Sequence, residues 1–161
     1  MKVLIIGIVA SGKSTLANRL GKENDIDVYE IDSIVHDDVN SIKRSCKEQT
    51  NIIMNINKKD NWIIEGTLRK NLYFLLDMAD KIIYIDIPLR IRKRRIITRY
   101  IKQKLKIERS NYKPSLEMVK KMNIWTYEFE KEKDMFEKNL NKYKKKLIIL
   151  NSVKKVNKYK L

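Results

Sequence analysis

The sequence predicts an α/β protein in which a parallel sheet is covered by helices on both faces. Short apolar runs alternate with longer segments whose apolar residues recur at helical spacing. The apolar runs are almost continuous, which is typical of parallel strands buried on both faces. No linker, repeat or low-complexity tract divides the 161 residues, so we expect one domain, 1–161, whose strands end at a common edge of the sheet.

Five strands are expected, each short and rich in aliphatic or aromatic residues. Their ranges are 2–6, 27–31, 61–65, 81–86 and 146–150. The second closes on Asp32, the third ends on Glu65 and Gly66, and the fourth is stopped by Pro88. Ligands of open parallel sheets bind beyond the carboxyl ends of the strands. We therefore expect Asp32 and Glu65 at a cleft together with the residues that follow the first strand.

Amphipathic spacing predicts helices between the strands. Their approximate ranges are 14–20, 40–57, 69–78, 89–108, 115–140 and 153–159. The first should stop at Gly21, a residue type common after a helix end. Asp86 should end the fourth strand and cap the helix that follows Pro88. The helical region from about 90 to 140 is expected to lie over the cleft as a lid rather than to form a separate unit.

Residues 7–14 carry the clearest chemical signal. They read Gly-Ile-Val-Ala-Ser-Gly-Lys-Ser, a complete Gly-x-x-x-x-Gly-Lys-Ser between an expected strand and an expected helix. In this pattern backbone N–H groups surround the phosphates, the lysine reaches the β and γ oxygens, and the serine hydroxyl can ligate Mg²⁺. A glycine-rich turn without a ligand is the alternative. The expected ATP-binding residues are Gly7, Ile8, Val9, Ala10, Ser11, Gly12, Lys13, Ser14 and Thr15.

The composition narrows the classes of function. Lys and Arg total 36 against 20 Asp and Glu, a formal net charge of +16. Such an excess favours polyanionic partners, which include nucleotides, nucleic acid and membrane surfaces. The single cysteine, Cys46, excludes a disulfide or a thiolate metal cluster within one chain and fits a reducing compartment. No run approaches the ~20 apolar residues of a membrane span, so we expect a cytoplasmic protein with no membrane partner.

Basic residues are concentrated between positions 90 and 113, where eleven Lys or Arg accompany one acid, Glu108. Arg92, Arg95 and Arg99 share one helix face, because residues three and four apart are neighbours on a helix. Guanidinium groups bind phosphate oxygens bidentately and can stabilise a phosphoryl group in transfer. With Lys13, we therefore expect Arg95 and Arg99 to be catalytic and Arg95 to contact ATP. A solvated helix face is the alternative.

These blocks together resemble the nucleoside and nucleotide kinases among the P-loop NTPases. The closer resemblance is to the small adenylate-kinase-like proteins known as DNA topology modulation proteins (FlaR-like). It rests on residues 7–14, 29–32, 62–66 and 84–88 and on the Arg-rich helix with its turn at 112–114. The resemblance implies a three-layer sandwich with a five-stranded parallel sheet of order 2-3-1-4-5 and a short helical lid. It also implies ATP- and Mg²⁺-dependent phosphoryl transfer to a small acceptor.

Residues 65–69, Glu-Gly-Thr-Leu-Arg, are similar to the Asp-Gly-Phe-Pro-Arg block of adenylate kinases. On this resemblance Glu65 joins Ser14 in holding Mg²⁺, and Arg69 grips an acceptor phosphate. Asp32 matches the acid that ends the second strand of the family. Val35 stands where adenylate kinases have an acceptor-binding arginine, and the lid lacks their long insertion, which argues against AMP. The acceptor side is expected to comprise Asp32, Arg44, Glu65, Gly66 and Arg69, where a helix cap is the alternative for Asp32 and a surface position is the alternative for Arg44.

Two functions follow from these patterns. The first is an ATP-dependent phosphotransferase with a small acceptor that bears a phosphate or a hydroxyl group. The alternative is a nucleic-acid-associated P-loop protein whose basic segment, 90–113, binds DNA or RNA under ATP control. Since no helix-turn-helix, zinc-finger or RNA-binding signature is present, the kinase is the preferred hypothesis.

Overall fold

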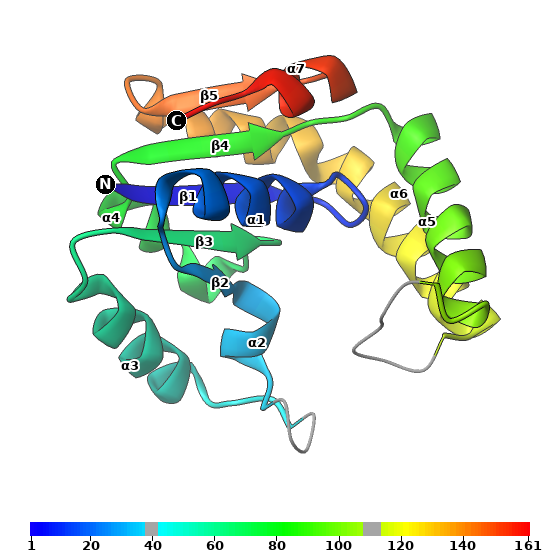
Figure 1. The fold of residues 1–161 in the computed structure, drawn as a ribbon, viewed down its shortest axis with the longest axis horizontal. Helices are drawn as coiled ribbons and strands as arrows, with labels where there is room; N and C mark the ends of the chain where they lie inside the picture. The colour runs from blue at the N-terminus through cyan, green and yellow to red at the C-terminus, as the bar shows by residue number, and fades with distance from the viewer. Residues whose placement is uncertain (38–41, 108–113) are drawn as a thin grey trace.

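The computed structural model describes residues 1–37, 42–107 and 114–161. A five-stranded sheet with the order β2-β3-β1-β4-β5 lies at its centre (Figure 1). Every neighbouring pair of its strands is parallel. The strands are β1 (Lys2–Gly7), β2 (Val28–Glu30), β3 (Trp62–Gly66), β4 (Lys81–Ile85) and β5 (Leu147–Leu150). The predicted α/β class and the strand order are therefore confirmed.

Helices cover both faces of this sheet (Figure 1). They are α1 (Lys13–Asn24), α2 (Ile31–Val35), α3 (Cys46–Asn57), α4 (Leu75–Met78), α5 (Leu89–Lys104), α6 (Leu116–Leu140) and α7 (Val153–Lys158), with 3₁₀ turns η1 (Lys70–Leu72) and η2 (Asn141–Tyr143). On one face, α1 and α7 share a buried apolar cluster with the strands, which includes Ile5, Leu16 and Val156. On the other face, a second cluster joins α2, α3, α4 and the end of α6 around Trp62 and Leu140. The three predicted layers are present.

The helices α5 and α6 overhang the carboxyl ends of the strands, where α5 and the first half of α6 lie beyond the sheet (Figure 1). Ile96 of α5 and Met122 of α6 are buried and line a small cavity that both helices enclose. Ser115 caps α6 by accepting a hydrogen bond from the Met118 N–H at 3.1 Å, which fixes its predicted start. Within residues 1–37, 42–107 and 114–161, no helix is long and apolar enough to cross a bilayer.

The first helix is longer than predicted, because Gly21 does not end it. α1 continues to Asn24, and the chain turns at Asp25, whose φ is 55°. A Cβ at Gly21 would lie 2.5 Å from Cγ2 of Val28 and 2.8 Å from the Ile26 carbonyl oxygen. Glycine is therefore needed at this position for the close approach of α1 to β2, rather than for a helix end.

We expect Gly21→Ala to lower the free energy of unfolding by about 1–3 kcal/mol, because the added methyl overpacks the contact with β2. The better helix propensity of alanine offsets at most ~1 kcal/mol of this loss. Urea denaturation measures the difference. The control is Asn18→Ala on the exposed side of the same helix, which should be neutral or slightly stabilising. Equal stability of Gly21→Ala and the wild type would show that β2 yields to the methyl group.

Other boundaries also differ from the prediction. The short helix α2, which follows β2 directly, was not predicted. α3 begins at Cys46 because Ser45 and Glu48 form a capping box, whereas part of its expected start, 38–41, lies outside the described residues. The helix expected at 69–78 is divided into η1 and α4. The C-terminal part of the predicted basic segment, 108–113, also lies outside the described residues.

Candidate phosphate-binding site

The loop that joins β1 to α1 forms the floor of the candidate site. Gly12 precedes α1 with φ 100°, and no side chain caps the helix, so its first N–H groups are available to an anion. Ala10 also has a positive φ, 60°. A Cβ at Gly7 would lie 2.7 Å from the Ile85 carbonyl oxygen, because β4 passes close to the loop. The residues therefore adopt the compact conformation that a phosphate-binding loop requires.

Lys13 lies against this loop. Its Nζ donates a hydrogen bond to the carbonyl oxygen of Ile8 at 3.0 Å. Desolvation lowers the pKa of Lys13 below its usual value, although the carboxylates of Glu65 and Asp32 act in the opposite direction. The positive charges of Arg99 and Arg92 also disfavour the protonated amine. A bound polyphosphate would replace the lost hydration of the ammonium group and would stabilise its charge.

Glu65 is almost buried beside the start of α1. In the sheet it is paired with Ile5, and only 4% of its surface is exposed. The Ser14 hydroxyl donates a hydrogen bond to its carboxylate. Burial raises the pKa of Glu65, although the contacts with Ser14 and Lys13 act in the opposite direction. The next residue, Gly66, lies under α2, where a Cβ would come within 2.6 Å of the Ile31 Cβ.

The oxygens of Ser14 and Glu65 fit a hard divalent cation such as Mg²⁺. Among the described residues, no group of three or more His, Cys, Asp or Glu side chains is placed to hold a metal. A cation here would therefore depend on phosphate oxygens for further ligands, as Mg²⁺ usually does. Its charge would also stabilise the ionised form of the desolvated Glu65.

We expect the Glu65→Gln variant to be more stable than the wild type at neutral pH. Because burial raises the pKa of this carboxyl above 4.5, the wild type loses stability as the pH rises through that value. The advantage of the variant should shrink on acidification and vanish below pH 4.5, where both folded and unfolded carboxyls are protonated. Urea denaturation of both proteins between acidic and neutral pH measures this difference in stability. Glu132→Gln on α6 is the exposed control, and the same pH response in both variants would contradict the assignment.

A second charged pair lies on the expected acceptor side. Asp32 in the first turn of α2 and Arg69 after β3 form an ion pair of 3.0 Å. The Asp32 side chain is 70% exposed, so it remains open to a ligand. The pairing fits the prediction that both residues face one cleft. Their contact with an acceptor stays a prediction.

Arg44 has a structural partner that the sequence did not reveal. Its Nη1 donates hydrogen bonds to the carbonyl oxygens of Ser33, at 2.6 Å, and of His36. These carbonyls belong to the C-terminal end of α2, where unpaired acceptors need donors. The guanidinium therefore holds the end of α2 in place. Its predicted contact with an acceptor stays a prediction and is not needed to explain its position.

The α5 arginines have distinct surroundings. Nη1 of Arg95 donates hydrogen bonds to the carbonyl oxygens of Ser11 at 2.9 Å and of Ala10 at 3.3 Å. It thereby places one guanidinium directly on the loop. Arg92 is 1% exposed, donates from Nε to the Ile87 carbonyl oxygen at 2.9 Å, and pairs with Glu130 of α6. The sequence predicts one face for Arg92, Arg95 and Arg99, and the structure makes Arg92 an internal anchor of α5.

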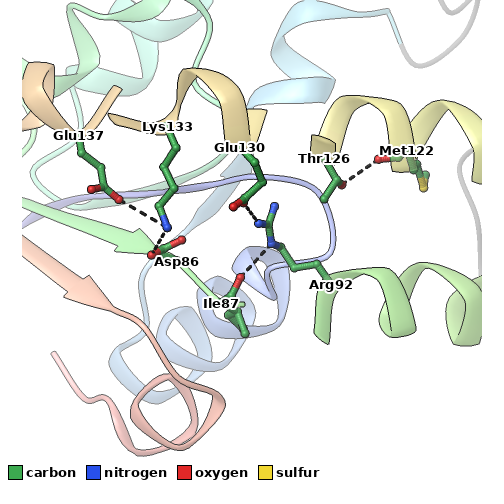
Figure 2. Close-up of polar contacts among 8 residues, drawn as sticks. All are labelled: Asp86, Ile87, Arg92, Met122, Thr126, Glu130, Lys133 and Glu137. Atoms are coloured by element: carbon green, nitrogen blue, oxygen red, sulfur yellow. Dashed lines mark hydrogen bonds and ion pairs between the residues drawn. The ribbon is translucent and has the colours of Figure 1, made fainter. Parts of the chain in front are cut away.

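Figure 2 shows this anchor beside a second ion pair. Lys133 of α6 donates to the Asp86 carboxylate at 2.7 Å, and Glu137 lies 3.8 Å from the same amine. The expectation that Asp86 caps α5 is wrong, because Pro88 occupies the N-cap position without a side-chain cap. Lys133 draws Asp86 toward α6 instead. A pocket of about 270 Å³ lies beside these pairs at the ends of β4 and β5, and Asn151 lines it.

Comparison with known proteins supports the fold. No family model and no curated protein matches the sequence. Among solved structures, shikimate kinase from Bacteroides thetaiotaomicron is 13% identical, with a TM-score of 0.55 over 93% of this chain and 85% of the other. Deoxyadenosine kinase from M. mycoides, with bound dATP, is 16% identical, with a TM-score of 0.52 over 94% and 90%. The chain has the fold of the P-loop kinases. The narrower resemblance to topology modulation proteins stays a prediction.

Proposed function

We propose that residues 1–161 act as one domain, an ATP-dependent phosphotransferase of the nucleoside and nucleotide kinase type with a small acceptor. The observation that carries this proposal is the complete phosphate loop, 7–14, in a P-loop kinase fold. Lys13, Ser14, Glu65 and Arg95 lie on or against that loop. The loop thus brings positive charge and backbone N–H donors together. Phosphoryl transfer requires both, because its catalysis consists mainly of positioning the reactants and neutralising their charge.

The donor side is formed by the loop and α5. The backbone N–H groups of residues 7–15 would bind the ATP phosphates, and Lys13 would exchange the Ile8 carbonyl for phosphate oxygens. Ser14 and Glu65 would hold Mg²⁺, which offsets phosphate charge when bound. Arg95 and Arg99 would stabilise the group in transfer. The pocket beside Asn151 offers room for the base near the turn after β5.

The acceptor side is formed by Asp32 and Arg69. Their pair offers a carboxylate that can accept a hydroxyl proton and a guanidinium that can bind an anionic group. We therefore propose a small acceptor with a hydroxyl as the attacking group and a phosphate as the recognition handle. Val35 argues against AMP. The two solved neighbours are named for small acceptors, shikimate and deoxyadenosine, which supports an acceptor of this size.

The test is single-turnover consumption of ATP against a panel of nucleosides, nucleotides, sugars and oligonucleotide ends. We expect a phosphate-bearing small molecule to be phosphorylated, with Asp32→Asn slowing the step on the order of 100-fold. Arg69→Ala should lower the affinity for the acceptor about 10-fold or more and leave the affinity for ATP unchanged. Asp60→Asn and Lys70→Ala, both exposed, are the matched controls.

Two results would contradict the proposal. The first is that the protein binds ATP but does not consume it with any acceptor of the panel. The second is Arg69→Ala weakening ATP and acceptor equally, since that would place Arg69 on the donor side. Transfer to oligonucleotide ends alone would favour the nucleic-acid alternative.

A further inference from the structure

The outward face of α5 carries an apolar stripe. Ile97, Ile101 and Leu105, the last at the C-cap, are 52%, 50% and 65% exposed. They are four residues apart and therefore follow one another along a single side of the helix. Arg92 is buried on the opposite side, because a rotation of about 100° per residue places Arg92 and Ile101 half a turn apart. The stripe thus faces away from the helix side that is packed on α6.

Cations flank this stripe, and acids are absent from it. Between positions 89 and 107 the sequence contains no Asp or Glu. The exposed basic residues of α5 nearest to the stripe are Arg90, Lys93, Arg94, Lys102 and Lys104. Arg92 and Arg95, which anchor the helix and contact the loop, belong to the inner side. The outer charges therefore have no part in the phosphate-binding loop.

We propose that this outward face, Ile97, Ile101 and Leu105 with their flanking cations, binds the surface of an anionic lipid bilayer. Basic side chains near such a surface each add roughly fivefold to the affinity. Their aliphatic stems can lie along the stripe while their charges reach the headgroups. The stripe can enter the boundary between headgroups and acyl chains, as in interfacial amphipathic helices. The expectation of no membrane partner came from the lack of a spanning segment, which does not bear on surface attachment.

The chemistry of the stripe favours lipid over the other polyanions. Single-stranded nucleic acid stacks on aromatic rings, and duplex recognition uses hydrogen-bonding side chains. Ile97, Ile101 and Leu105 provide neither rings nor donors. A second copy of the chain would bring the same positive face against this one, so charge complementarity also argues against self-association.

Vesicle co-sedimentation of the full chain tests the proposal. We expect binding to phosphatidylcholine vesicles that contain phosphatidylserine and little binding to phosphatidylcholine alone. The triple variant Ile97→Gln, Ile101→Gln and Leu105→Gln keeps the net charge of the protein and residues compatible with a helix. Its partition coefficient onto the anionic vesicles should nevertheless be at least about 10-fold lower than that of the wild type. Replacing Arg90, Lys93 and Arg94 by glutamine should lower it on the order of 100-fold.

Matched controls remove equal numbers of exposed groups elsewhere. The apolar control is Ile42→Gln, Met54→Gln and Met135→Gln, and the charge control is Lys142→Gln, Lys144→Gln and Lys145→Gln. Both should bind vesicles within about twofold of the wild type. Circular dichroism checks that α5 is retained in each variant.

Three results would overturn the proposal. The first is no sedimentation with the anionic vesicles. The second is sedimentation that the stripe variant retains in full, since this would reduce the interaction to charge alone. The third is binding to duplex DNA that responds to both sets of substitutions while vesicle binding does not.

Discussion

The rate of ATP-dependent phosphoryl transfer is expected to fall about 10²–10³-fold in the Lys13→Ala variant. The substitution removes a positive charge that is already positioned to stabilise the negative charge of the transition state. The Lys13 amine lies against the loop and contacts the Ile8 carbonyl oxygen, so it is already placed beside the expected phosphate position. Single-turnover ATP consumption with the best acceptor of the panel measures the loss. Lys22→Ala, in the exposed last turn of α1, is the control and should retain activity.

The same substitution should leave the fold intact. Desolvation lowers the pKa of Lys13, which means that folding disfavours its charged form at neutral pH. Removing the amine therefore should not lower the free energy of unfolding, and urea denaturation can measure this. A variant that is strongly destabilised would show that the loss of activity comes from the fold. Retained turnover in a stable variant would contradict the role of Lys13 in phosphoryl transfer.

The loop and the strand and helix that flank it could be predicted from the sequence because their determinants are local. The loop 7–14 is a contiguous pattern, and the strand and helix that flank it have their own periodicities. Glu65 and Asp32 follow from the rule that parallel strands end at one edge. The strand order came from the resemblance and is confirmed in the structure. The C-terminal end of α1 was missed because Gly21 serves a contact with Val28 in another element.

Contacts between distant segments explain what could not be predicted. Arg92 pairs with Glu130, 38 positions away, and Lys133 binds Asp86, 47 positions away. Neither pair has a local pattern, and a run of arginines looks the same whether its members face solvent or another helix. Arg44 was placed on the acceptor side by its position in the resembling family, and its contacts with the carbonyl groups of α2 could not be predicted because α2 was not predicted. In the structure, the basic residues of α5 have three kinds of surroundings. Arg92 is buried as an anchor, Arg95 contacts the loop, and the others on the outer side are exposed.

The Glu130→Ala variant is expected to be about 2–3 kcal/mol less stable than the wild type, because it leaves the buried Arg92 guanidinium without its carboxylate. This value is below that of a fully buried pair, since the Glu130 side chain is 30% exposed and Arg92 keeps the Ile87 carbonyl. Urea denaturation measures the change. Glu128→Ala, exposed on the same helix, should shift stability by no more than about 0.5 kcal/mol.

The Arg92→Met variant separates the cost of an unpaired charge from the loss of a favourable contact. Methionine keeps much of the apolar volume and removes the desolvated charge, so we expect stability within about 1 kcal/mol of the wild type. In that background Glu130→Ala should cost less than ~0.5 kcal/mol, since no buried cation remains to be satisfied. If Arg92→Met is as damaging as Glu130→Ala, the contacts of the guanidinium with Ile87 and Glu130 are net stabilising and outweigh the cost of burying its charge. In that case both contacts help to fix the first turn of α5, which leads to the Arg95 contact with the loop.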